Sequence, residues 1–166
     1  MKLKGLVAAA FGGIISFGAM STANADHHLG KQGTFSGQIG IVTLSENVMA
    51  MSENHVYITG KYAGTSTNSS GSGFLHNTAW ACGGTLEIVD GVPTGIGYCT
   101  VTDQDGDQIS GQWSCTAGTD DCDQYFNIGG TGKYEGMQSH NKFKLIFIGS
   151  TGHFNSFLWD GAYTIP

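Results

Sequence analysis

The sequence predicts an all-β domain, and the architecture it favours is an eight-stranded antiparallel β-barrel. Short runs of Val, Ile, Thr and aromatic residues alternate with segments rich in Gly, Asn, Asp and Ser, which is typical of antiparallel strands joined by turns. Glycine makes up 27 of the 166 residues, more than double its usual share, and strand glycines often mark the bends of barrel corners. No segment after residue 25 keeps a 3.6-residue apolar period, so helices are not expected. A two-sheet β-sandwich is the alternative architecture.

The expected strands follow the apolar and β-branched runs in order along the chain. The stretch Gly64–Gly73, with the sequence GTSTNSSGSG, is expected to be a flexible loop and a candidate lid. The strand candidates are Thr34–Leu44, His55–Tyr62, Gly73–Ala81, Gly84–Val89, Thr94–Thr102, Gln108–Cys115, Tyr125–Ile128, Lys142–Ile148 and Phe154–Tyr163.

Residues 1–25 are predicted to be a secretory signal peptide. Lys2 and Lys4 precede an uncharged apolar run from Leu6 to Met20, and Ala23-Asn24-Ala25 supplies an A-x-A cleavage pattern. The apolar run is shorter than the roughly 20 residues that a membrane-spanning helix needs, so no span is expected after cleavage. The mature chain, residues 26–166, is expected to form one barrel domain in the periplasm or outside the cell.

The charge of the mature chain argues against several classes of partner. Five lysines stand against thirteen acidic residues, a formal charge of −8, and the chain contains no arginine. A phosphate backbone requires a basic surface, and two-point recognition of phosphate or carboxylate favours arginine. Nucleic acid, nucleotides and anionic membranes are therefore not expected as partners.

The four cysteines are expected to form two disulfides, because an even count in an exported chain favours them over a metal site. Asp90-Gly91 is a signal for a two-residue type I′ turn, and centring the turn there places Cys82 opposite Cys99. The pair falls on a non-hydrogen-bonded site, where the Cα atoms are about 4.5 Å apart and a disulfide can form. Cys115 then pairs with Cys122.

A second turn is predicted at Asp105-Gly106. Extrapolating its register places Tyr98 opposite Trp113 and Thr102 opposite Ile109. In this register Glu87, Tyr98 and Trp113 share one face of the sheet, which we expect to line the barrel lumen as a ligand-binding site. Two aromatic walls beside a carboxylate suit an apolar or aromatic ligand with one hydrogen-bonding group.

The C-terminal third resembles the allene oxide cyclase and dirigent-type β-barrels. The resemblance rests on the strand around Tyr125–Ile128, the turn Gly129–Gly136 (GGTGKYEG) and the aromatic strand Phe157–Gly161, and it covers roughly residues 106–161. It implies an eight-stranded barrel, often trimeric, whose lumen binds hydrophobic molecules. The family's catalytic asparagine and glutamate do not transfer to Glu46 and Asn47, because the surrounding sequence does not match.

Cleavage after Ala25 would expose Asp26-His27-His28 at the amino terminus. The free amine, two backbone amides and the imidazole of His28 can form the square plane of nitrogen ligands that Cu(II) and Ni(II) prefer. The mature amino terminus is therefore a candidate copper site. The remaining histidines show no zinc-site spacing. The acidic run Asp103–Asp107 lacks the glycine and glutamate positions of an EF-hand, so a hairpin turn explains it better than a calcium loop.

These observations favour an exported barrel that binds a small apolar or aromatic molecule in its lumen, without a cofactor. One alternative is a cyclase or isomerase that uses Glu87 or Tyr98 for acid–base chemistry. A second is a structural or interaction protein with a filled core. A homo-oligomer, by resemblance a trimer, is the expected assembly.

Overall fold

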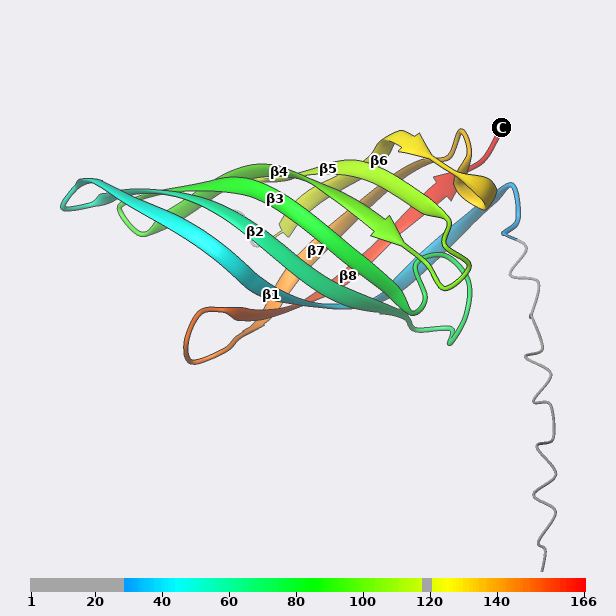
Figure 1. Cartoon of the computed structure of the whole chain (residues 1–166), viewed down its shortest axis with the longest axis horizontal. Coiled ribbons are helices and arrows are strands. Elements are labelled where there is room, and N and C mark those ends of the chain that lie inside the picture. The colour runs from blue at the N-terminus through cyan, green and yellow to red at the C-terminus, as the bar shows by residue number, and fades with distance from the viewer. Residues whose placement is uncertain (1–28, 118–120) are drawn as a thin grey trace, which may run out of the picture.

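The computed structural model, which describes residues 29–117 and 121–166, is a closed barrel of eight strands, each antiparallel to its neighbours (Figure 1). The strands follow one another around the barrel in chain order, and β8 closes it by pairing with β1. The predicted fold class is confirmed. The strands are β1 (Gln32–Ser52), β2 (His55–Asn68), β3 (Thr78–Val89), β4 (Val92–Thr102), β5 (Gln108–Cys115), β6 (Asp121–Gly130), β7 (Gln138–Ile148) and β8 (Phe154–Thr164), with a 3₁₀ turn, η1 (Gly132–Tyr134), between β6 and β7.

Several of the predicted strand boundaries are wrong. The first two strands continue past their predicted ends at Leu44 and Tyr62, to Ser52 and Asn68. The candidates Gly73–Ala81 and Gly84–Val89 belong to one strand, β3, because Gly83 and Gly84 continue the pairing with both neighbours instead of ending it. The segment before β3 is not extended. Leu75 and Asn77 have positive φ, and the loop turns inward there. The first part of the expected flexible loop, Gly64–Asn68, is the end of β2.

This β2–β3 loop plugs one end of the barrel. Phe74 and Leu75 are buried, and the Phe74 ring packs against Phe35, Phe126 and Tyr134. Inside the same end, Ser66 Oγ donates a hydrogen bond to the carbonyl of Leu75 and receives one from Trp80 Nε1. Aromatic side chains therefore fill this half of the lumen, which is the hydrophobic core of the protein.

The β3–β4 hairpin has the predicted register. Asp90 and Gly91 both have positive φ, as a type I′ turn requires, and Val89 pairs with Val92. Cys82 faces Cys99 with their Cα atoms 4.1 Å apart, and the two form a disulfide. The second predicted disulfide, Cys115–Cys122, is also present and joins β5 to β6.

The β4–β5 register differs by one residue from the prediction. Tyr98 pairs with Gln112, and Trp113 faces Gly97. The cause is the turn, which has a three-residue loop with Gly106 at positive φ instead of a two-residue loop. The Asp103 side chain stabilises this longer turn by accepting hydrogen bonds from the backbone N–H groups of Asp105 and Asp107. A shift of one residue moves every β5 side chain to the opposite face of the sheet.

At the end opposite the plug, β1–β4 extend beyond the shorter β5 and β6 (Figure 1). A β-bulge between Thr43 and Ser45 marks where β1 enters this extension, just beyond its last pairing with β8 at Val42. Inner-face residues here, such as Ile58 and Leu86, are only half-buried, whereas those near the plug are buried. The lumen is therefore accessible from this end.

Candidate functional site

A row of paired residues runs around the inside of the barrel. It leaves β1 at Glu46 and returns to β1 at Phe35, the stagger expected when tilted strands close a barrel. Three glycines are neighbours in the row, on β2, β3 and β4, and the large side chains of Trp113, Gln124 and Asn141 follow them. In order around the barrel, the row is Glu46, Gly60, Gly84, Gly97, Trp113, Gln124, Asn141, Gly161 and Phe35.

The three neighbouring glycines on β2, β3 and β4 make room for two aromatic rings. A Cβ on Gly84 or Gly97 would lie 2.4 or 2.5 Å from the indole ring of Trp113. A Cβ on Gly60 would lie 2.3 Å from the hydroxyl oxygen of Tyr62. The rings of Trp113 and Tyr62 therefore pack directly on the backbone of these glycines, on the inner face and in the more accessible half of the lumen.

Polar side chains are buried on the inner face of the opposite wall. Asn141 Nδ2 donates a hydrogen bond of 3.2 Å to Gln124 Oε1. Asn141 Oδ1 and Trp159 Nε1 have no hydrogen-bond partner within the described ranges, although both residues are only 1% exposed. Asn141 pairs with Gly161 and Trp159 pairs with Phe143, so the two residues are diagonal neighbours on β7 and β8. A buried acceptor and a buried donor without partners cost free energy unless another molecule satisfies them.

The structure does not bring the predicted ligand-binding residues together. Glu87 and Tyr98 share a face, as expected, but it is the outer one. Tyr98 is 59% exposed, and Glu87 lies beside His55, with His55 Nε2 2.7 Å from Glu87 Oε1. Of the three predicted residues, only Trp113 faces the lumen, where it packs against the core. The prediction that the three residues share one face is wrong, because in the observed β4–β5 register Trp113 lies on the inner face and Tyr98 on the outer face.

The predicted copper-binding residues Asp26, His27 and His28 lie outside the described residues, as does the predicted signal peptide, so both stay predictions. Within the ranges that the structure describes, no group of three or more His, Cys, Asp or Glu side chains could hold a metal ion. In the same ranges, no helix has the length and apolar character needed to cross a membrane.

The acidic run Asp103–Asp107 binds a lysine of the same chain. Lys133 Nζ lies 2.7 Å from Asp103 Oδ2 and forms a second ion pair with Asp105. The backbone N–H of Lys133 donates to Asp107. Burial alone would raise the pKa of Asp103, but hydrogen bonds from Lys133 and Tyr134 outweigh it and lower this pKa below its usual value. The GGTGKYEG turn is therefore attached to the β4–β5 turn.

Two ionisable residues, Glu46 and Tyr62, are near each other on the inner face, toward the accessible end of the lumen. Glu46 pairs with Gly60, and the hydroxyl group of Tyr62 lies over that glycine. Burial raises the pKa of the Tyr62 hydroxyl, and the nearby Glu46 carboxylate raises it further. Tyr62 therefore keeps its proton at neutral pH and can donate a hydrogen bond.

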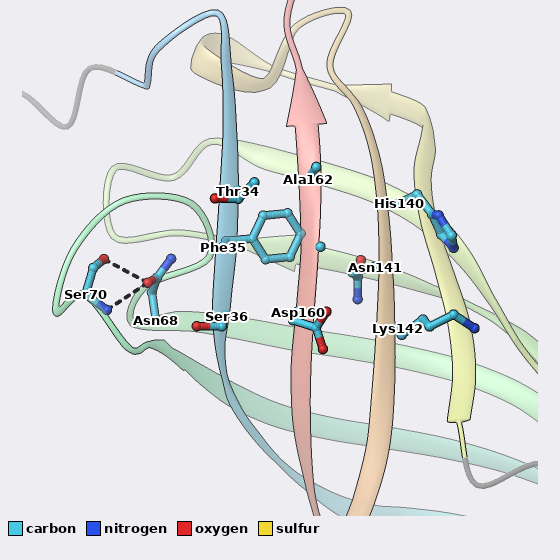
Figure 2. Close-up of a pocket in the computed structure, with 11 residues that line it drawn as sticks. Thr34, Phe35, Ser36, Asn68, Ser70, His140, Asn141, Lys142, Asp160 and Ala162 are labelled. Atoms are coloured by element: carbon cyan, nitrogen blue, oxygen red, sulfur yellow. Dashed lines mark hydrogen bonds between the residues drawn. The ribbon is translucent and has the colours of Figure 1, made fainter.

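A second concave region lies on the outside of the barrel. It is an open depression of about 690 Å³ across β1, β8 and β7, with the β2–β3 loop at its edge (Figure 2). Figure 2 shows that three neighbouring strands supply most of its lining residues and that Ser70, in the loop at its rim, donates two hydrogen bonds to Asn68 at the end of β2. Its outward-facing strand residues are Thr34, Ser36, His140, Lys142, Asp160 and Ala162.

Ion pairs and ring stacking order one border of this depression. His140 Nε2 lies 2.7 Å from Asp123 Oδ1, and Lys142 Nζ lies 3.5 Å from the same oxygen. The hydrogen bond with His140 is the main cause that lowers the pKa of Asp123. The imidazole also stacks on Tyr125, with ring centroids 4.4 Å apart and planes 3° from parallel.

Sequence reasoning missed Gln124, Asn141 and Trp159 as site residues. One signal could have found Asn141. On β7, His140, Lys142 and Lys144 alternate with Ser139, Asn141 and Phe143. A period-2 row of charged residues marks the solvent face, so the intervening residues point to the interior. Trp159 lies in the aromatic strand Phe157–Gly161 that the sequence predicts, but nothing in the sequence distinguishes it from an ordinary core residue.

Comparison with known proteins supports the architecture. No protein-family model matches the sequence, and no curated protein matches it. Among solved structures, the pterocarpan synthase dirigent protein GePTS1 matches with a TM-score of 0.52 and 12% identity, over 92% of this chain and 99% of that one. The pterocarpan synthase dirigent protein PsPTS1 matches with a TM-score of 0.54 and 11% identity, over 81% and 96%. At such identity the likeness concerns the fold, and the chain therefore has a dirigent-type eight-stranded barrel.

Proposed function

We propose that the protein binds a small apolar or aromatic molecule with at least one hydrogen-bonding group in its lumen, and that the molecule enters from the accessible end. The observation that carries this proposal is the pair of buried, unpartnered atoms, Asn141 Oδ1 and Trp159 Nε1. Together they offer one acceptor and one donor, which suits a hydroxyl group.

The surroundings of these atoms support an apolar body for the ligand. Trp113, Phe143 and Phe157 are half-buried on the inner face of neighbouring strands, and Phe143 and Phe157 make an edge contact with centroids 5.4 Å apart. Aromatic walls with a few polar groups are typical of small-molecule sites. The solved dirigent proteins of this fold include pterocarpan synthases, which is consistent with a lumen that accommodates small molecules.

A matched pair of probes tests the proposal. We expect 2-naphthol to quench the tryptophan fluorescence and to bind about tenfold more tightly than naphthalene, which lacks the hydroxyl group. Asn141→Ala should remove most of this difference between the probes. Trp113→Ala should weaken binding of both probes by about 1–3 kcal/mol, the scale of one lost aromatic contact.

Tyr98→Ala is the control, because Tyr98 lies on the outer face and should leave both affinities unchanged. Equal affinity for the two probes in the wild-type protein, or no binding of either, would contradict the proposal. Native mass spectrometry of the protein from its own host then reports the natural ligand and the number of subunits together.

The alternative function, a cyclase or isomerase, cannot use Glu87 or Tyr98 from inside the barrel. One observation still favours it, since Tyr62 and Glu46 place a proton donor beside a carboxylate on the inner face. Once the ligand is known, Tyr62→Phe separates the two functions. Loss of turnover with binding retained would indicate catalysis, and unchanged behaviour would indicate binding alone.

We also infer that the protein is exported. Two disulfides are present, and disulfides persist mainly in oxidising compartments. Together with the predicted signal peptide, they favour the periplasm or the extracellular space. Amino-terminal sequencing of the protein from its host should start at Asp26, and a start at Met1 would contradict the inference.

A further inference from the structure

We propose that the outer depression on β1, β8 and β7 is a second binding site, independent of the lumen, and that it takes a neutral oligosaccharide. A sugar presents hydroxyl groups that donate and accept hydrogen bonds, and it presents apolar C–H faces that pack on aromatic rings. The depression and its border provide partners for both.

The polar partners lie in one row across the outer face. Ser36 pairs with Asp160, Asp160 pairs with Lys142, and Lys142 pairs with Asp123. Within the described residues, the side chains of Ser36 and Asp160 make no hydrogen bond or ion pair. They are therefore available to a ligand, and a carboxylate can accept hydrogen bonds from two adjacent hydroxyl groups.

The aromatic partners lie in the next row. His140 pairs with Tyr125, Tyr125 with Gln112, and Gln112 with Tyr98. The outer face therefore carries aromatic residues at both Tyr125 and Tyr98, which are two strand spacings, about 10 Å, apart. The Gln112 amide lies between them, so an extended chain of sugars can contact both rings and hydrogen bond in between.

The charges of the region favour a neutral ligand. Lys142 and His140 lie beside Asp123, and Lys142 also pairs in register with Asp160, so positive and negative groups alternate. The chain has no arginine, the residue best suited to hold a carboxylate or phosphate. The size of the depression, about 690 Å³ and open to solvent, suits a ligand that lies along a surface.

Affinity electrophoresis provides the first test. The mature protein is run in native gels that contain laminarin, hydroxyethyl cellulose, galactomannan or dextran. We expect retardation by at least one of these neutral polysaccharides, and titration calorimetry with the corresponding pentasaccharide should then give the affinity. Asp160→Ala and Tyr125→Ala should each weaken binding about tenfold or more.

Two control variants separate this site from the rest of the molecule. Glu87→Ala removes an exposed carboxylate on the same side of the sheet but outside the depression, and it should leave the affinity unchanged. Trp159→Phe removes the unpartnered lumen N–H, and it should also leave saccharide binding unchanged, so the two proposals can fail independently. Thermal unfolding of each variant confirms that it is folded.

Several outcomes would overturn the proposal. They are a lack of retardation in all four gels, and saccharide binding that survives both Asp160→Ala and Tyr125→Ala in folded protein. Sedimentation provides a third. If the protein forms an oligomer that dissociates when Ala162→Lys is introduced, a second copy of the chain covers the depression and no saccharide site exists there.

Discussion

Lys133 lies 2.7 Å from Asp103, and this ion pair joins two turns that are far apart in the sequence. Asp103 belongs to the β4–β5 turn, and Lys133 belongs to the 3₁₀ turn η1 between β6 and β7. The Asp103 side chain is 6% exposed and that of Lys133 is 19% exposed, so water screens this pair only weakly. The pair therefore anchors one end of the barrel, beside the buried ring of Tyr134.

Replacing Lys133 should destabilise the protein. Lys133→Met leaves the buried Asp103 carboxylate without its cation, so we expect a loss of about 2–3 kcal/mol in the free energy of unfolding, measured with urea. The control is Lys142→Met, whose ion pair with Asp123 is exposed and should contribute less than about 1 kcal/mol. Equal effects of the two substitutions would show that the Asp103 pair contributes no more to stability than an exposed ion pair.

The same pair predicts how stability depends on pH. The pKa of Asp103 is lowered from 3.8 in the folded protein, so its contribution is present above the unfolded value and is lost as pH falls through the folded one. The pKa of Lys133 is raised from 10.5, so its contribution is present below that value and is lost as pH rises further.

Urea unfolding at a series of pH values below 5 measures the acid side. The wild-type protein should lose stability more steeply toward low pH than Asp103→Asn, which has no proton to bind at that position. Parallel curves for the two proteins would mean that other carboxyl groups, such as Asp123, account for the acid sensitivity.

The close packing of Trp113 on Gly84 predicts that alanine substitutions at the adjacent residues Gly83 and Gly84 have very different effects on stability. A Cβ on Gly84 would lie 2.4 Å from the Trp113 ring and 2.6 Å from the carbonyl oxygen of Ile96, whereas a Cβ on Gly83 meets nothing closer than 3.7 Å. Gly84→Ala should therefore destabilise the protein by about 1–3 kcal/mol and shift its tryptophan emission. Gly83→Ala should change neither by much, and a similar cost for both would argue against close packing of the ring.

The two disulfides should contribute unequally. Cys82–Cys99 closes a longer loop than Cys115–Cys122, with sequence separations of 17 and 7. In the chain-entropy model, removing the first by double alanine substitution should cost about 3 kcal/mol, and removing the second about 0.8 kcal/mol less. Urea unfolding of the two double variants measures both, and the reverse order would show that local packing outweighs loop entropy.

Residues close together in the chain determined the local parts of this structure. The period-2 pattern and the many turn residues predicted an all-β barrel, and β5 has the predicted limits, Gln108–Cys115. The β3–β4 register followed from the Asp90-Gly91 turn and the position of the two cysteines, because a two-residue turn leaves one way to pair the strands.

The tertiary structure alone decided which residues form the site. The β4–β5 register depends on a three-residue turn held by the Asp103 side chain and, through Lys133, by a distant segment. The inward face of β3 and β4 was equally undetermined, because apolar residues lie on both faces and only barrel closure chooses between them. A shift of one residue reverses the face of a strand, so Trp113 lies in the lumen while Tyr98 lies outside. The pairing of Asn141 with Gln124 likewise exists only once β6 and β7 meet inside the closed barrel.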